Sequence, residues 1–176
     1  MHVPESVSAE LRPIGEEVAR VEESTRHSAQ GQFEQMKLWR ATNLLLGVPA
    51  TGLSAAAGGT FLADAGQAQL AGALALIAAA LTAVSTTVNA ARRAEGAGAA
   101  ANSYLDLQTD ARQLLLVDLP HLTFDEGRER LSQLTQRRSE VNANADPPSR
   151  WARRKAEKNL AEGGQDYEID RSAEGA

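Results

Sequence analysis

The chain has 176 residues, enough for one ordinary domain, and its formal net charge of −5 argues against general nucleic-acid binding. It contains no cysteine, which excludes disulfide bonds, zinc sites built on thiolates and cysteine nucleophiles. Aromatic residues make up only 4% of the chain, few for the core of a soluble protein of this size. The mean hydropathy is negative, but this average combines polar ends with an apolar middle.

The N-terminal part of the chain is polar. Residues 1–15 include Pro4 and Pro13, and we expect this segment to be disordered. Residues 16–40 are predicted to form a cytoplasmic helix, because apolar residues recur along it at helical spacing and lead to Trp39. This stripe consists of Val18, Val21, Ala29, Phe33 and Met36.

Two long uncharged runs follow, residues 41–63 and 65–91, separated only by Asp64. As an α-helix the first run would extend about 34 Å, and the hydrocarbon core of a bilayer is about 30 Å thick. We therefore predict an all-α membrane protein with a two-helix transmembrane hairpin, with crossings at about 41–63 and 69–91, and flanking cytoplasmic helices. The alternative is a soluble, alanine-rich helical hairpin, although a soluble helix normally carries a charged face.

The positive charges around these runs indicate an orientation. Lys37 and Arg40 precede the first run, Arg92 and Arg93 follow the second, and the connection between the runs has no Lys or Arg. Because positive residues stay on the cytoplasmic side, both termini are predicted to be cytoplasmic in a multi-pass protein. Trp39 is placed as an aromatic belt residue at the headgroup level, or is an ordinary packing tryptophan.

Small residues recur at every fourth position in both runs. The first series is Gly47, Thr51, Ala55 and Gly59, and the second includes Ala75, Ala79, Ala83 and Thr87. Small residues let helix backbones approach closely in lipid, so we predict that these stripes pack helices together, within the hairpin or between copies of the chain. Two helices cannot enclose a channel, so a pore would need a homo-oligomer. In an alanine-rich sequence such stripes also arise by chance, and membrane Ser and Thr residues often bond their own helix backbone.

Pro49 lies inside the first run, between Gly47 and Gly52. Proline cannot donate a backbone hydrogen bond and clashes with the preceding turn, so the helix is predicted to kink there. The kink is either a gating hinge or a packing adaptation, and we favour the packing adaptation.

Three more cytoplasmic helices are predicted, at about 92–118, 124–142 and 150–162. Thr123 and Glu126 have the spacing of a capping box, and Ser149 is placed to cap the last helix. The last helix is basic and could lie on the anionic cytoplasmic leaflet or be a solvated face that pairs with acidic neighbours. Residues 163–176 are predicted to be an acidic, disordered tail. The basic residues of the last helix are Arg150, Arg153, Arg154, Lys155 and Lys158.

No pattern in the sequence supports catalysis. The histidines His2, His27 and His121 are scattered and form no ligand pair at helical spacing. No nucleophile, base and orienting group come together in the sequence. We therefore predict no catalytic, metal or cofactor site, and no enzyme activity.

The chain resembles a SLATT domain over about residues 16–162. The resemblance is carried by LWRATNLLLGVPATGLSAAAGGTF, by LALIAAALTAVSTTVNAARRAEGAGAAANSYLDLQTDAR and by PPSRWARRKAE. SLATT domains are two-transmembrane effectors associated with nucleotide-second-messenger synthetases and SLOG sensor domains. The resemblance implies a bacterial inner-membrane effector of a conflict or anti-phage system that forms pores when triggered. The distinctive positions are Gly47-Val48-Pro49, Gly58-Gly59, Asn89, Tyr104, Leu107 and Arg112.

The resemblance implies partners but no residue-level site. A chain of this length has no room for a fused sensor domain, so we expect the trigger to be a sensor or nucleotidyltransferase partner protein, or a nucleotide signal acting on the flanking helices. Membrane lipid is the other expected partner. Two alternative functions stay open, namely a membrane-anchored helical interaction module without pore activity and a holin-like lysis protein.

Overall fold

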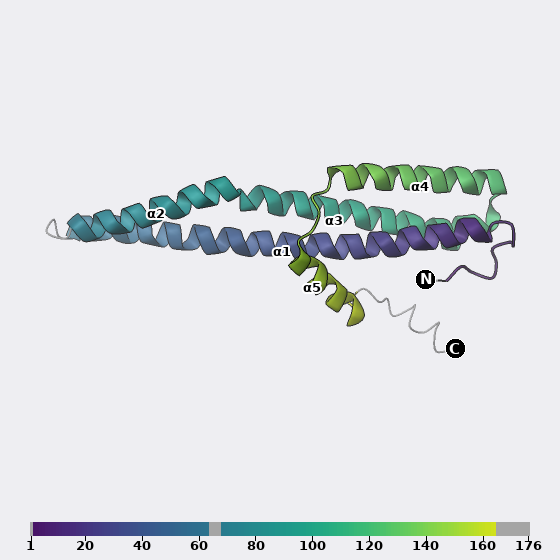
Figure 1. Cartoon of the computed structure of the whole chain (residues 1–176), viewed down its shortest axis with the longest axis horizontal. Coiled ribbons are helices and arrows are strands. Elements are labelled where there is room, and N and C mark those ends of the chain that lie inside the picture. The colour runs from purple at the N-terminus through teal and green to yellow at the C-terminus, as the bar shows by residue number, and fades with distance from the viewer. Residues whose placement is uncertain (1, 64–67, 165–176) are drawn as a thin grey trace. The chain divides into compact units, whose positions relative to one another are not determined.

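The computed structural model describes residues 2–63 and 68–164, and every regular element in these ranges is helical (Figure 1). The predicted all-α fold is therefore confirmed. The chain divides into two compact units. Unit 1 contains residues 1–35 and 96–176, and unit 2 contains residues 36–95. Residues 64–67 of the predicted connection between the crossings, and residues 165–176 of the tail predicted over 163–176, lie outside the described residues.

The helices follow the predicted order with some changes of boundary. The elements are α1 (Arg12–Ala63), α2 (Ala68–Val88), α3 (Ala90–Gln113), the π-helical turn η2 (Leu114–Asp118), the 3-10 turn η3 (Leu119–His121), α4 (Phe124–Asn144) and α5 (Arg150–Ala161). Helix α1 begins before residue 16 and runs without a break through residue 40, where the sequence analysis placed a boundary between two helices.

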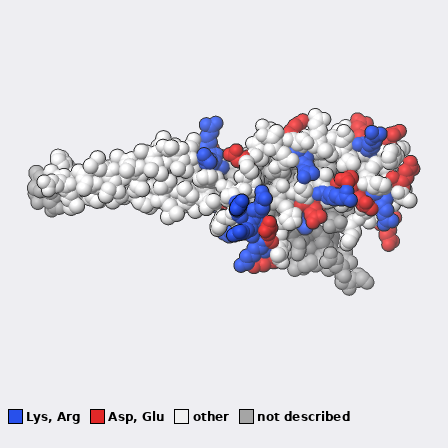
Figure 2. All heavy atoms as spheres, in the orientation of Figure 1, with Lys and Arg blue, Asp and Glu red and all other residues white. Residues whose placement is uncertain are grey.

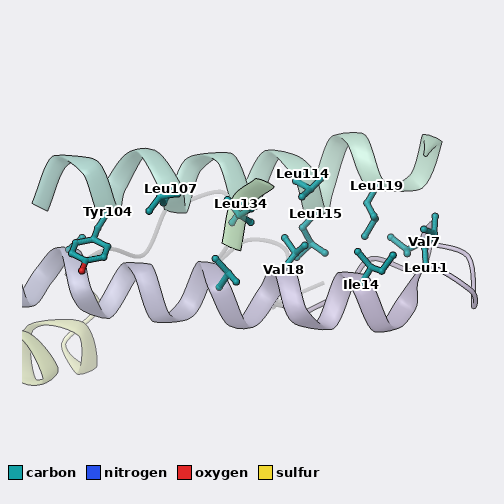
Figure 3. Packing of buried hydrophobic residues seen from close by; sticks show 13 residues of the cluster. Val7, Leu11, Ile14, Val18, Tyr104, Leu107, Leu114, Leu115, Leu119 and Leu134 are labelled. Atoms are coloured by element: carbon teal, nitrogen blue, oxygen red, sulfur yellow. The ribbon is translucent and has the colours of Figure 1, made fainter. Parts of the chain in front are cut away.

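An apolar core holds unit 1 together (Figure 3). Leu107 in the C-terminal half of α3, Leu115 in η2 and Leu119 in η3 are almost completely buried in this core. Burial of such a side chain stabilises a protein by about 1.5–3 kcal/mol relative to exposure. Helix α4 approaches this core closely, because a Cβ atom at Gly127 would lie 3.2 Å from Leu11 Cδ2 and 3.3 Å from Leu119 Cδ1.

The N-terminal segment differs from the disordered segment that we expected over residues 1–15. Val7 and Leu11 are buried in the core of unit 1, together with Ile14. These three apolar residues are spaced by three or four positions, which places them on one side of the chain as α1 begins. Pro4 and Pro13 do not prevent this packing, since Pro13 lies in the first turn of α1, where proline is tolerated.

The predicted helix caps of unit 1 are confirmed. The Thr123 side chain accepts a hydrogen bond from the Glu126 backbone N–H, and the Glu126 carboxylate accepts one from the Thr123 backbone N–H at 2.9 Å. The backbone N–H and, at 2.7 Å, the hydroxyl of Thr123 both donate to this carboxylate, and these two bonds lower the pKa of Glu126. At α5, the Ser149 side chain accepts a bond from the Ala152 N–H, and Gly163 with a φ of 77° ends the helix.

Candidate functional site

Two helices are long and apolar enough to cross a membrane, and they contain the two predicted crossings. Only 11% of the most apolar 18-residue stretch of each helix is buried within the protein. A core helix of a soluble protein passes the same length test but is mostly buried. The apolar residues of unit 2 are therefore mostly on its surface, where Leu44, Leu76 and Ile77 are examples.

Within unit 2, α2 runs alongside the second half of α1 (Figure 1), and the two helices together line one groove. The most buried residues of α2 and of the part of α1 beside it are Ala50 and Ala57 on α1, 6% and 7% exposed, and Ala71 and Ala78 on α2, 6% and 3% exposed. Each pair is separated by seven residues. A seven-residue repeat keeps one seam in register along two supercoiled helices. Partly buried residues fill the intermediate positions of this seam: Leu46, Leu53 and Thr60 on α1, and Leu74, Leu81 and Ser85 on α2.

The first predicted series of small residues lies outside this seam. Thr51, Ala55 and Gly59 are exposed and Gly47 is only half-buried. A Cβ atom built at Gly47 or Gly59 would meet no neighbouring atom within 4 Å beyond the helix's own backbone. A step of four residues advances about 400° around a helix of 3.6 residues per turn, so such a row drifts away from a straight contact line.

The second predicted series lines an open groove beside the seam. Ala75, Ala79, Ala83 and Thr87 are all exposed and all border this groove of about 1100 Å³. On the α1 side the groove is bordered by Ser54, Ala57, Gly58 and Phe61. No member of the first series lines it. The structure thus separates the residues that join α1 to α2 from a row of small residues that is left uncovered.

Most hydroxyl groups of unit 2 bond the backbone of their own helix. Thr51 donates to the Gly47 carbonyl oxygen at 2.9 Å, Thr82 to that of Ala78 at 2.9 Å, and Thr87 to that of Ala83 at 2.8 Å. Ser54, Thr60 and Thr86 make equivalent bonds four residues back. These bonds satisfy the hydroxyl hydrogens without water, which a lipid environment requires.

The charged flanks of the two apolar runs meet at one end of unit 2. The Arg93 guanidinium carbon lies 5.0 Å from the centroid of the Trp39 ring, a cation–π contact. Lys37 and Arg40 lie within two residues of Trp39, and Arg92 adjoins Arg93. On the face seen in Figure 2, the surface of α2 and the adjoining part of α1 shows neither blue nor red. The positive residues that flank the two uncharged runs therefore lie at the same end of the helix pair.

The second apolar helix breaks where it reaches these charges. Asn89 has a φ of 49°, in the left-handed region, and separates α2 from α3. We expected the boundary between the crossing and the next helix at residues 91 and 92, with no break at Asn89. Asparagine enters the left-handed region more readily than other non-glycine residues, so Asn89 just before Arg92 was an available signal. Pro49, the predicted hinge, is exposed, and α1 continues on both sides of it.

The basic residues of α5 have different surroundings in unit 1. Lys155 Nζ lies 3.4 Å from Oε2 of the buried Glu34, and Lys158 lies 3.7 Å from Glu162. Arg153 borders a smaller pocket of about 400 Å³ that His27 and Tyr104 also line. Arg150 and Arg154 are exposed. The five basic side chains therefore do not form one uniform surface.

Several buried polar side chains of unit 1 are engaged in structural contacts. Gln108 Nε2 donates to Glu22 Oε1 at 2.9 Å, and the Tyr104 hydroxyl donates to Asn142 Oδ1 at 2.7 Å. Burial raises the pKa of Tyr104, and the charge of Arg138 partly offsets this. Over residues 2–63 and 68–164, no three His, Asp or Glu side chains are grouped so that they could hold a metal ion.

A scan of protein-family models finds no match to this chain, and comparisons with curated proteins and with solved structures find none either.

Proposed function

We propose that this chain is a two-crossing membrane protein of the bacterial inner membrane, with both termini in the cytoplasm, whose copies associate and permeabilise the membrane when triggered. The observation that carries the proposal is the uncovered row Ala75, Ala79, Ala83 and Thr87 beside an otherwise apolar and uncharged surface. The row is not used to join α1 to α2, so it is open to a second copy.

The membrane part of the proposal is supported by the surface of unit 2. Many of its large apolar side chains are exposed, most of its hydroxyl hydrogens are bonded within the helices, and the positive residues that flank both runs lie at one end beside Trp39. In water, exposed side chains such as Leu45 and Leu76 would form an apolar patch of a size that soluble monomers rarely carry. In a bilayer they would face lipid, and the positive end would face the cytoplasm.

Association of copies is supported by the chemistry of the groove. Apolar burial does not drive helices together in lipid, where close backbone packing does more of the work. Alanine side chains along the groove allow this approach, whereas the bulky Ile77 and Val84 lie on a different side of α2. The resemblance to SLATT domains adds the expected role, an effector in a conflict or anti-phage system that a partner protein or a nucleotide signal activates.

Neighbouring alanines on α2 allow a matched test, because the chain has no native cysteine. Ala79 borders the groove, whereas Ala80 is exposed and does not line it. We would introduce Ala79→Cys or Ala80→Cys, oxidise native membranes and quantify cross-linked dimers. The proposal expects several-fold more dimer from Ala79→Cys. Equal or absent cross-linking in both variants, with the protein confirmed in the membrane, would favour a monomeric anchor for an interaction module.

Permeabilisation needs a separate measurement. The protein would be expressed inducibly in bacteria and the membrane potential followed with a voltage-sensitive dye, with and without a candidate trigger protein. Ala79→Leu should reduce depolarisation, because the larger side chain blocks close packing at the groove. Ala80→Leu should not reduce it. Membranes that stay polarised under every condition, despite cross-linking through Ala79→Cys, would exclude a pore and leave an assembled membrane module.

A further inference from the structure

Helix α5 has a buried side and an oppositely directed basic side. Ala152 and Ala156 are buried against the rest of unit 1. On the side opposite these alanines, Arg150, Arg154 and Lys158 follow one another at every fourth residue and are all exposed. Residues four apart share one face of a helix, so these three side chains form a row, which we call the basic row. Helix α5 carries five basic residues and one acidic residue, although the whole chain has a net charge of −5.

Polar contacts fix α5 and the linker before it to one short stretch of α1. The Ser149 backbone N–H donates to Gln35 Oε1 at 2.9 Å. Gln32 Nε2 donates to the Asp146 carbonyl oxygen at 2.6 Å. Lys155 Nζ lies 3.4 Å from Glu34 Oε2, with the Glu34 side chain 1% exposed. Lys155 therefore anchors the helix, and the basic row is held on the outer side.

The anchoring stretch lies close in the chain to the start of the apolar run. Gln35 precedes Arg40 by five residues. Even a fully extended chain spans at most about 18 Å over five residues, and an α-helix spans about 8 Å. The headgroup region on each side of a bilayer adds several ångströms to the hydrocarbon core. If Arg40 lies at the cytoplasmic boundary, α5 is tethered within reach of the lipid headgroups.

We propose that the basic row of α5 binds the anionic headgroups of the membrane from which the chain's own apolar helices emerge. This inference rests on the proposed membrane location. Trp151, half-exposed beside the row, has its ring 4.9 Å from Lys155 Nζ, so the lysine that anchors α5 also positions an aromatic side chain suited to the membrane interface. Lys158 also contacts Glu162, so Arg150 and Arg154 are the members of the row that have no ion pair in the described chain.

The test uses the full chain with a fluorophore on Ala161→Cys, an exposed position at the end of α5 on the side of the basic row. The labelled protein is reconstituted into nanodiscs of zwitterionic phosphatidylcholine alone or mixed with phosphatidylglycerol. We expect a blue-shifted emission only with the anionic lipid, and reversal of the shift at high salt, since salt screens exposed charges.

A charge-matched pair of variants isolates the row. Each basic residue near an anionic leaflet strengthens attachment roughly fivefold, so Arg150→Gln/Arg154→Gln should weaken it about thirtyfold and abolish the blue shift. Arg128→Gln/Arg130→Gln removes the same charge from the exposed surface of α4 and should leave the shift intact. A similar loss in both variants would overturn the proposal, because it would reflect net charge alone.

The remaining outcomes separate this inference from the proposed function. A chain that fails to co-purify with the nanodiscs would count against the membrane location itself. A chain that enters the discs but has the same emission in both lipids would overturn the role of the basic row and leave the membrane location standing. If removal of residues 165–176 shifts the emission regardless of lipid charge, the acidic tail is the partner of the row, and the proposal is also overturned.

Discussion

Two adjacent leucines in η2 should respond very differently to truncation. Leu115 is completely buried in the core of unit 1, whereas Leu116 is 44% exposed. Leu115→Ala removes three buried carbon atoms, worth about 0.8 kcal/mol each in transfer free energy. The cavity left behind adds a further cost, so we expect the free energy of unfolding to fall by about 3 kcal/mol or more. Leu116→Ala should lower it by about 1 kcal/mol or less, because its side chain already contacts solvent.

Hydrogen exchange measured by mass spectrometry on the full chain in detergent would report the difference. A loss of about 3 kcal/mol raises the population of opened states more than a hundredfold, since each 1.4 kcal/mol is a factor of ten. The amides of α3 and η2 should therefore exchange much faster in Leu115→Ala than in Leu116→Ala. Equal acceleration in the two variants would refute the burial pattern of the π-helical turn, and faster exchange in Leu116→Ala would reverse it.

Two further predictions concern local backbone structure. Asn89→Gly should preserve or slightly raise the stability of the α2–α3 junction, because glycine adopts a φ near 49° freely. Asn89→Val should lower the stability of the junction by about 1–2 kcal/mol. Equal thermal stability of the two variants in detergent would contradict this prediction. The pKa of Glu126 is lowered from 4.5 by its bonds to Thr123, so the carboxylate stabilises the start of α4 above pH 4.5 and this contribution is lost as the pH falls through the lowered value. Hydrogen-exchange protection of the first amides of α4, corrected for intrinsic rates, should fall in that acidic range. Glu126→Gln should remove this pH dependence. A pH dependence of the protection that survives Glu126→Gln would show that another group is responsible.

Structural features that depend on residues a few positions apart were predicted correctly from the sequence. The capping box of Thr123 and Glu126 and the cap at Ser149 depend on side chains three residues from the groups they bond, so spacing alone identifies them. The uncharged runs likewise predicted long apolar helices from composition. In each case the physical cause lies within one or two helical turns, and the printed sequence contains all of it.

Structural features that depend on contacts between residues far apart in the chain were not predicted correctly. Steps of four in an alanine-rich run do not reveal which alanines face a partner, and the structure puts Ala78 in the seam and Ala79 outside it. Val7 and Leu11 looked like part of a polar, proline-containing end, because the leucines of η2 and η3 that cover them lie about a hundred residues later in the chain. Nothing in the sequence distinguishes the basic residues of α5 from one another, whereas in the structure Lys155 lies beside Glu34.

The hydroxyl bonds of the groove determine which hydrogen bonds a neighbouring copy could make there. Ser54, Thr82, Thr86 and Thr87 all line the groove, and each commits its hydrogen to a carbonyl oxygen of its own helix. A serine or threonine hydroxyl has one hydrogen to donate but two lone pairs that accept. These side chains therefore present acceptors to the outside and no donors. A second copy that packs against the groove can donate hydrogen bonds to these oxygens but finds no free hydroxyl hydrogen there to accept.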